Sequence, residues 1–307
     1  MIDIIIPAYN AHSTILRTLS SIALQHNKDI IKVCIVDDCS DKDYSDEIKL
    51  FEDKVYIKQI KTEKNSGAGI ARQVGIDNTD SEYIMFLDAD DLLHDSYTIT
   101  NFLNLVKKRK LDMIYGTIID EQNNDQIYIY CNHQGCLHGK LYRREFIKNK
   151  KIRFIDSYFH EDNAFNRLVL LHSPNILFLD KYVYVYKNNK SSITNVSNNN
   201  FGNLEIFIDN MIKTIDTGIK HKCDIKEIAN LLYNTIFYVY KIFVFNYEDI
   251  NKDFIIKWSK PLLLYYNKYS RELSQEKIFD IYIGFGIPNS SISFSDFINL
   301  VNDYKGD

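Results

Sequence analysis

The sequence has few of the residues that mark unusual classes of protein. Only 4 of its 307 residues are proline, 11 are glycine and one is tryptophan. This scarcity excludes a collagen-like or low-complexity chain, and 45% hydrophobic with 25% charged residues indicates an ordered globular protein. A formal net charge of -4 gives no overall attraction to nucleic acid. The length suffices for one large or two modest domains.

Cysteines and long apolar runs are scarce as well. The 5 cysteines are an odd number, and their spacings match neither a zinc knuckle nor a disulfide framework, so we expect reduced thiols. No stretch reaches the roughly 20 uninterrupted apolar residues of a membrane span, and the start has no basic leader. We therefore expect a cytoplasmic protein, and peripheral contact with the inner membrane face remains open.

The first half of the chain alternates short apolar runs with helical patterns, which is typical of βαβ units. We expect strands at residues 3–6, 31–36, 55–60, 83–87 and 113–118. Each expected strand ends in polar residues, and ligands of an open parallel sheet lie beyond the carboxyl ends of its strands. The predicted fold class is therefore α/β with a mostly parallel sheet and a ligand site at one edge.

The second half has a different pattern. Residues 115–131 suggest a hairpin, and the asparagine-rich segment 188–203 reads as a linker. Beyond it the pattern is helical. We predict a first domain at residues 1–203 and a helical C-terminal subdomain at 204–307. The segment 231–245 is too apolar for a surface helix, which favours a core helix or a homodimer interface over a membrane anchor.

A pair of carboxylates, Asp88 and Asp90, follows the expected strand at 83–87. Two carboxylates one residue apart can face one ion while water completes its shell, which suits Mg²⁺ or Mn²⁺. No cluster of cysteine or histidine lies nearby in the sequence to favour zinc. The alternative is a solvated turn before a helix.

An arginine, Arg72, follows the run Asn-Ser-Gly-Ala-Gly at 65–69, where backbone amides and a guanidinium can meet an anion. Together with a metal it would describe a diphosphate site, and a plain surface arginine is the alternative. The run lacks the Lys-Ser/Thr of a P-loop and is no dinucleotide fingerprint, which disfavours a kinase or a Rossmann dehydrogenase.

Three further groups have two interpretations each. Asp37 and Asp38 can offer a carboxylate to a base imide, and Tyr9 can stack on a base, although all three suit an ordinary turn. Glu161 and Asp162 precede an expected helix, where a carboxylate can act as general base or simply cap the helix.

Six motifs in order resemble the family 2 glycosyltransferases of GT-A fold, over residues 2–195. They are IIIPAYN at 4–10, VDDCS at 36–40, NSGAGIAR at 65–72, YIMFLDADD at 83–91, GKLYRR at 139–144 and EDNAF at 161–165. Each motif alone is moderately specific, and the ordered series is much more so.

The resemblance implies an inverting transferase that moves a sugar from a nucleotide-sugar, most often a UDP-sugar, to an acceptor hydroxyl with Mn²⁺ or Mg²⁺ as cofactor. The residues implied to contact the donor are Pro7, Tyr9, Asp38, Asn65, Arg72 and Asp88. Asp90 and Asp88 are the implied metal ligands. Asp162 is the implied base, with Glu161 beside it.

The chain departs from the family pattern twice. Cys39 stands where the family usually has glycine, and residues 186–189 lack the later histidine that many relatives use as a further metal ligand. The acceptor is not encoded by any motif. Seven basic residues suit a phosphorylated acceptor, such as a teichoic acid or lipid-linked saccharide, or an acidic membrane, or else form a solvated helix face. They are Lys140, Arg143, Arg144, Lys148, Lys150, Lys151 and Arg153.

The expected role is surface glycan or polysaccharide biosynthesis. Two alternatives remain open. One is a glycosyltransferase that modifies a macromolecule, either protein or a hydroxylated nucleobase in DNA, and the other is a catalytically inactive module that binds nucleotide-sugars. The sugar and the linkage depend on pocket contacts that no motif encodes.

Overall fold

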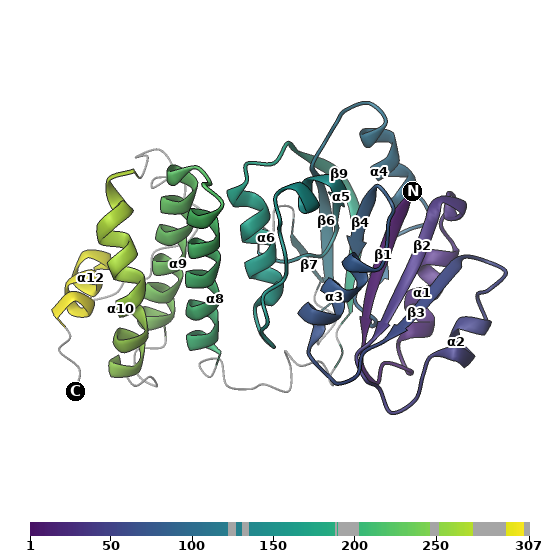
Figure 1. The fold of residues 1–307 in the computed structure, drawn as a ribbon, viewed down its shortest axis with the longest axis horizontal. Helices are drawn as coiled ribbons and strands as arrows, with labels where there is room; N and C mark the ends of the chain where they lie inside the picture. The colour runs from purple at the N-terminus through teal and green to yellow at the C-terminus, as the bar shows by residue number, and fades with distance from the viewer. Residues whose placement is uncertain are drawn as a thin grey trace. The chain divides into compact units, whose positions relative to one another are not determined.

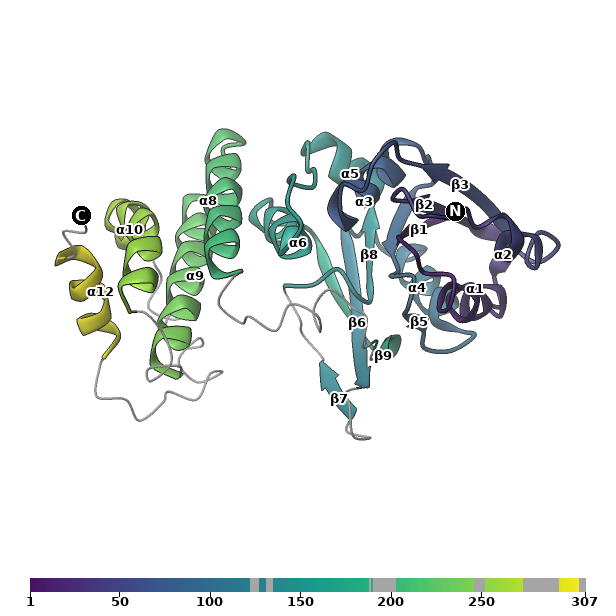
Figure 2. The same ribbon diagram turned by 90° about the horizontal axis from the view of Figure 1, so that it is seen from below.

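The computed structural model describes residues 1–121, 127–130, 135–187, 189, 203–245, 252–272 and 293–303. The chain divides into two compact units (Figures 1 and 2). One consists of Met1–Val169 with Pro174–Asn199, and the other of Leu170–Ser173 with Asn200–Asp307. This division falls close to the expected boundary after residue 203. Most of the expected linker lies outside the described residues.

The first unit is built on a sheet whose described strands number nine, in the order β3-β2-β1-β4-β8-β6-β9-β5 with β7 paired to β6. Its first four strands are β1 (Ile2–Ala8), β2 (Ile31–Asp37), β3 (Tyr56–Lys61) and β4 (Tyr83–Phe86), and they pair in parallel. Each lies within two residues of a run expected from the sequence. All seven residues of β1 are buried, as a strand covered on both faces requires.

The rest of the sheet is mixed, which differs from the mostly parallel arrangement expected. β8 (Lys140–Arg143) lies between β4 and β6 (Met113–Glu121) and is antiparallel to both. β9 (Ile176–Lys187) runs parallel to β6, and β5 (Leu92–Leu93) pairs antiparallel with β9. The expected hairpin is present, since β6 and β7 (Ile127–Tyr130) pair antiparallel. Its turn lies outside the described residues.

Helices cover both faces of this sheet (Figure 2). On one face, α1 (Ile15–Ala23) and α4 (Thr98–Val106) bury apolar side chains in a common core with Ile4 of β1. Ile48 of α2 (Ser45–Lys49) packs against the same core. On the other face lie α3 (Ala68–Asp77), α5 (Arg144–Asn149) and α6 (Glu161–Leu171). The rings of Phe86 and Phe165 meet edge to face there, 5.8 Å apart. The helices thereby fix the strand ends that carry the polar residues.

The second unit is helical, as predicted, and contains α8 (Leu204–Lys220), α9 (Ile225–Phe245), α10 (Lys252–Tyr269) and α12 (Phe294–Asp303). The apolar segment 231–245 lies in α9, where Leu232, Ile236 and Val239 are at most 1% exposed. It is a core helix of this unit, and a homodimer stays a prediction. Among the helices in the described ranges, none is long and apolar enough to cross a bilayer.

Candidate active site

The strands β1, β2 and β4 pair in parallel, so their carboxyl ends lie at one edge of the sheet (Figure 1). Pro7 is buried near the end of β1, and Tyr9 follows it with 52% of its surface exposed. Asp38 follows the neighbouring β2, and Asp88 comes two residues after β4. Strands that pair in parallel end at the same edge of a sheet, so residues up to 81 positions apart share one site.

Asp38 holds the loop that precedes α3. Its buried carboxylate accepts hydrogen bonds from the backbone N–H of Ser66 at 3.1 Å and of Gly67 at 2.7 Å. The hydroxyl of Thr62 donates a third at 3.0 Å. Gly67 has φ +87°, a conformation that favours glycine. The Asp38 carboxylate therefore fixes the position of the loop that also carries Asn65.

Asn65 is itself held from two sides. Its Oδ1 accepts a hydrogen bond from the backbone N–H of Gly67 at 3.3 Å. Its carbonyl oxygen accepts one from the hydroxyl of Tyr158 at 3.1 Å. These two hydrogen bonds fix the orientation of Asn65, one of the residues expected to contact the donor.

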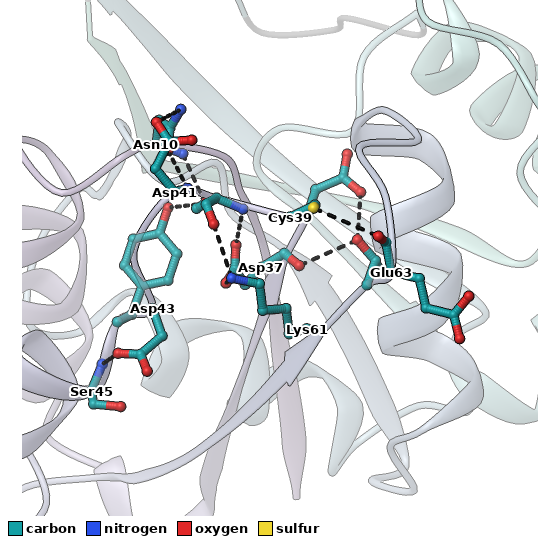
Figure 3. Close-up of polar contacts among 12 residues, drawn as sticks. Asn10, Asp37, Cys39, Asp41, Asp43, Ser45, Lys61 and Glu63 are labelled. Atoms are coloured by element: carbon teal, nitrogen blue, oxygen red, sulfur yellow. Dashed lines mark hydrogen bonds and ion pairs between the residues drawn. The ribbon is translucent and has the colours of Figure 1, made fainter.

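The turn after β2 is stabilised by side chains from several segments (Figure 3). Asn10 and Asp41 exchange two hydrogen bonds, one from Asn10 Nδ2 at 3.2 Å and one from the Asp41 backbone N–H at 3.0 Å. Asp37 accepts a hydrogen bond from the Ser40 backbone N–H at 2.8 Å, and Lys61 Nζ lies 3.5 Å from its other oxygen. Asp37 therefore stabilises the turn that follows Asp38, at the sheet edge where Tyr9 also lies.

Cys39 lies at the bend of this turn with φ 65°. This is the left-handed region, which glycine enters at no steric cost. The backbone therefore keeps the conformation that the usual family glycine would favour, and the cysteine carries the strain. Its Sγ lies 3.7 Å from the carbonyl oxygen of Glu63.

Arg72 connects the loop after β4 with the start of α6. Its guanidinium is buried, and it donates to Oδ1 of Asp88 at 2.6 Å and to Oε1 of Glu161 at 2.8 Å. Burial disfavours the cation, but Asp88 and Glu161 outweigh it and raise the pKa of Arg72. A Cβ at Gly69 would lie 2.4 Å from Cγ of Glu161, so only glycine lets α3 approach this carboxylate so closely.

Glu161 and Asp162, the general-base candidates, are the first two residues of α6, whereas the sequence pattern placed them just before the helix. Burial raises the pKa of Glu161 to about 7, and Asp162 adds to this while Arg72 opposes it. Oδ1 of Asp162 accepts a hydrogen bond from the Asn163 backbone N–H at 2.7 Å. This contact uses one oxygen and does not conflict with a role as base.

Three carboxylates crowd the loop after β4. Burial raises the pKa of Asp90, with Asp88 adding to the effect, and burial also raises the pKa of Asp91 to about 7. Asp88 shows the opposite direction, because Arg72 and His138 overcome its burial and lower its pKa. A divalent cation would relieve the repulsion among these groups, so the chemistry of the loop fits Mg²⁺ or Mn²⁺.

The three carboxylates have different partners. Asp91 is fully buried, with one oxygen bonded to the Tyr184 hydroxyl at 2.6 Å and the other to the Lys187 backbone N–H at 2.8 Å. Asp90 accepts a hydrogen bond from Asn189 Nδ2 at 2.9 Å. Asp91 thus braces the loop, whereas Asp88 and Asp90 remain the expected ligand pair.

Sequence reasoning missed His138, which enters the site just before β8. Its Nε2 lies 3.3 Å from Oδ2 of Asp88, and one ligand atom from each of Asp88, Asp91 and His138 lies within 4.8 Å of the others. The ring also stacks on Tyr184 with centroids 4.8 Å apart. No spacing along the chain connects residue 138 with residue 88, so only the insertion of β8 beside β4 shows the contact.

Several members of the basic run at 140–153 support the fold. Lys140 is buried and donates to the carbonyl oxygen of Cys136, and Arg144 pairs with Asp3 at 2.7 Å. Interpreting these two as contacts for an acceptor or a membrane was wrong, because neither ammonium nor guanidinium faces outward. Lys148, Lys150 and Lys151 are exposed.

A second group of cations lies away from the site. A pocket of about 460 Å³ near the start of β4 is lined by Glu82, Tyr83 and Arg143 together with residues 106–110. Because Asp88 lies beyond the opposite end of β4, this pocket is separate from the candidate active site.

The family model for glycosyl transferase family 2 matches residues 3–172. Poly(ribitol-phosphate) beta-N-acetylglucosaminyltransferase TarP of Staphylococcus aureus is 27% identical over 77% of this chain and 73% of TarP. Glycosyltransferase GlyA of Streptococcus pneumoniae is 27% identical over 64% of this chain. The chain spans only 32% of the length of GlyA.

Among solved structures, S. aureus TarS in complex with UDP-GlcNAc superposes with a TM-score of 0.71 at 20% identity. The match covers 85% of this chain and 80% of that one, which confirms the GT-A fold. The family model covers more than half of the sequence and includes all six motifs. The chain therefore belongs to glycosyl transferase family 2.

Proposed function

We propose that this chain transfers a sugar from a UDP-sugar to a hydroxyl of a phosphate-containing surface glycan, with inversion and with a divalent cation. The observation that carries the proposal is the double contact of Arg72. This buried guanidinium joins Asp88 at the donor edge to Glu161 beside Asp162. A donor-phosphate region and a general-base candidate are thereby held in one hydrogen-bonded cluster.

On the donor side, the nucleoside would lie against the strand ends. Tyr9 offers an exposed ring for stacking, and Pro7 is buried near the end of β1. Asp38 and Asn65 would contact the base from the braced loop. UDP is favoured because TarS, which shares the fold, is known in complex with UDP-GlcNAc.

At the diphosphate, a cation held by Asp88 and Asp90 would supply positive charge against the departing phosphates. Arg72 contributes fixed positive charge within the same cluster and needs no reorganisation as charge develops. Asp88 has its Oδ1 occupied by Arg72, so its other oxygen is the one available to a ligand. These side chains would orient the donor for displacement at the anomeric carbon.

At the acceptor, Asp162 would take the proton from the attacking hydroxyl. Attack on the face opposite the leaving diphosphate inverts the anomeric centre in a single displacement. Glu161 is the poorer base in place, because its Oε1 is bonded to Arg72. It would instead hold Arg72 and the start of α6 in register.

The acceptor class is inferred from the relatives and not from the site. TarP and TarS carry the name poly(ribitol-phosphate) transferases, and TarP aligns over 77% of this chain. A phosphate-rich glycan is therefore favoured over a protein or a hydroxylated nucleobase. Action in the cytoplasm, with or without peripheral membrane contact, remains part of this proposal.

The first experiment is a thermal-shift screen of UDP, GDP, CDP and dTDP, each with and without Mn²⁺. A ligand that binds only the folded state raises Tm. We expect a Mn²⁺-dependent shift confined to UDP, and its loss in Asp90→Ala. Asp95→Ala is the matched control, because Asp95 is a loop carboxylate on the same domain outside the cluster.

A second experiment follows the sugar. Wild-type protein incubated with UDP-GlcNAc, Mn²⁺ and poly(ribitol-phosphate) should yield a β-linked product by NMR, as inversion of an α-linked donor requires. An α-linked product would refute the single displacement. A UDP shift without transfer to this polymer would redirect the search to other acceptors, and a UDP shift without transfer to any acceptor would favour the inactive module that binds nucleotide-sugars. No shift with any nucleotide would contradict the proposed donor site.

A further inference from the structure

His138 contacts the oxygen of Asp88 that Arg72 does not contact. Its side chain is 20% exposed, and its Nε2 faces Oδ2 of Asp88 at 3.3 Å, while Oδ1 of that carboxylate is taken by Arg72. The only oxygen of Asp88 open to a cation is thus the one shared with an imidazole. Two ligands at a right angle around an ion at roughly 2.1 Å lie roughly 3 Å apart, close to this separation.

The geometry points to His138 as a direct ligand of the divalent cation, through Nε2 and alongside Asp88. This inference rests on the proposed function, because it concerns the same cation. An imidazole nitrogen is a better ligand for Mn²⁺ and later first-row ions than for Mg²⁺, which prefers oxygen. His138 would therefore set the metal preference of the site toward Mn²⁺.

The ring is oriented before any ion arrives. It stacks on Tyr184 at an interplanar angle of 25° and leans on Tyr186 with centroids 5.4 Å apart. The side chain of Cys136, two residues earlier in the chain, also interacts with this imidazole. A metal-bound histidine is commonly fixed by such neighbours, which hold the ring plane and leave one nitrogen toward the ion.

Asn189 does not replace this ligand. It occupies the segment where many relatives carry the later histidine, and it donates to Asp90 at 2.9 Å. An amide oxygen there would be a hard ligand with no preference for Mn²⁺ over Mg²⁺. The segment 186–189 contains no histidine. In this proposal His138, which precedes β8, supplies the nitrogen ligand beside Asp88.

The test is pulsed EPR of Mn²⁺ bound to the intact protein with UDP. Echo-envelope modulation detects the ¹⁴N of a coordinated imidazole, a readout independent of turnover. We expect the ¹⁴N signal in wild type and its loss in His138→Gln. Mn²⁺ affinity should fall on the order of tenfold or more, with a smaller change for Mg²⁺. His138→Asn provides a second variant in case the first folds poorly.

His94→Gln is the matched control. His94 is 30% exposed, its Nδ1 lies 3.4 Å from Asp95 and its ring leans on Tyr182, so its environment resembles that of His138 outside the carboxylate cluster. It should keep both the signal and the affinity. Mn²⁺ binding with no ¹⁴N signal in wild type, or a signal that survives in both His138 variants, overturns the ligand assignment and leaves the transferase proposal intact. Failure of wild type to bind Mn²⁺ with UDP overturns the assignment together with the proposed metal requirement.

Discussion

The hydroxyl of Tyr184 donates a 2.6 Å hydrogen bond to Oδ2 of Asp91, 93 residues earlier in the chain. The same hydroxyl oxygen lies 3.3 Å from the backbone nitrogen of Asp88, which donates to it. One side chain of β9 thus holds both ends of the loop that carries the expected metal ligands. This contact explains why a third carboxylate, Asp91, follows the expected ligand pair yet is fully buried.

Asp91 makes the stability of the metal-free protein depend on pH. Its pKa is about 7 in the folded state because of burial, against an ordinary value of 3.8. Between these values the folded state holds a proton that the unfolded state has lost, so the contribution of Asp91 falls as pH rises from about 4 to about 7.

The advantage in Tm of wild type over Asp91→Asn in EDTA should therefore be larger at pH 5 than at pH 8. Other titrating groups, such as Glu161, are present in both proteins and largely cancel in the difference. The measurement is thermal unfolding at both pH values. A difference that grows with pH would contradict the assigned direction.

Arg72→Lys should destabilise the first unit. A lysine ammonium cannot reach both Asp88 and Glu161 in the forked geometry of the guanidinium, so one buried carboxylate loses its partner. Such a loss costs on the order of 3 kcal/mol, or about 6 to 12 °C in Tm.

Arg153→Lys is the control for this change. Arg153 also pairs with a carboxylate, Asp77 at 2.7 Å, but its side chain is 60% exposed. Its substitution should cost less than about 1 kcal/mol, since exposed pairs contribute little. Equal losses of stability in Arg72→Lys and Arg153→Lys would contradict the prediction that the buried ion pairs of Arg72 contribute more than an exposed pair.

Cys39→Gly should stabilise the protein slightly. Relief of a left-handed φ is worth about 1 to 2 kcal/mol, and the extra backbone freedom of glycine offsets about 0.5 to 1 kcal/mol of it. Cys39→Ala keeps the Cβ and should show no gain. Chemical denaturation of the three proteins decides the point, and a stabilised alanine variant would place the effect in the thiol instead of the backbone.

The four parallel strands and their polar ends were predictable because local patterns determine them. Every residue of strand β1 except Asp3 is apolar, and the carboxylates Asp38 and Asp88 lie within two residues of the ends of β2 and β4. β8 was not predictable in the same way. Its residues 140–143 include three polar or charged side chains, and a sequence pattern does not show that Lys140 is buried.

The partners within the site were harder to predict than its members. Arg72 was expected to meet a diphosphate, and its pairing with Glu161 across 89 residues depends on how α6 packs against α3. His138 reaches Asp88 across 50 residues because β8 inserts beside β4. Long-range contacts of this kind follow from tertiary packing, which single residues and short spacings do not encode.

Asp162→Asn provides the sharpest test of the proposed chemistry. Asparagine keeps an oxygen for the Asn163 backbone N–H, so α6 should begin where it does in wild type. It cannot accept the acceptor proton, and loss of a positioned general base lowers kcat by roughly 10² to 10⁴. UDP binding should remain within about twofold of wild type, because the donor contacts lie on the strand ends.

Asp180→Asn is the control, because Asp180 is an exposed carboxylate on β9, and this change should leave kcat unchanged. Wild-type turnover by Asp162→Asn would assign the proton transfer to another group, and Glu161→Gln would then be the variant to measure.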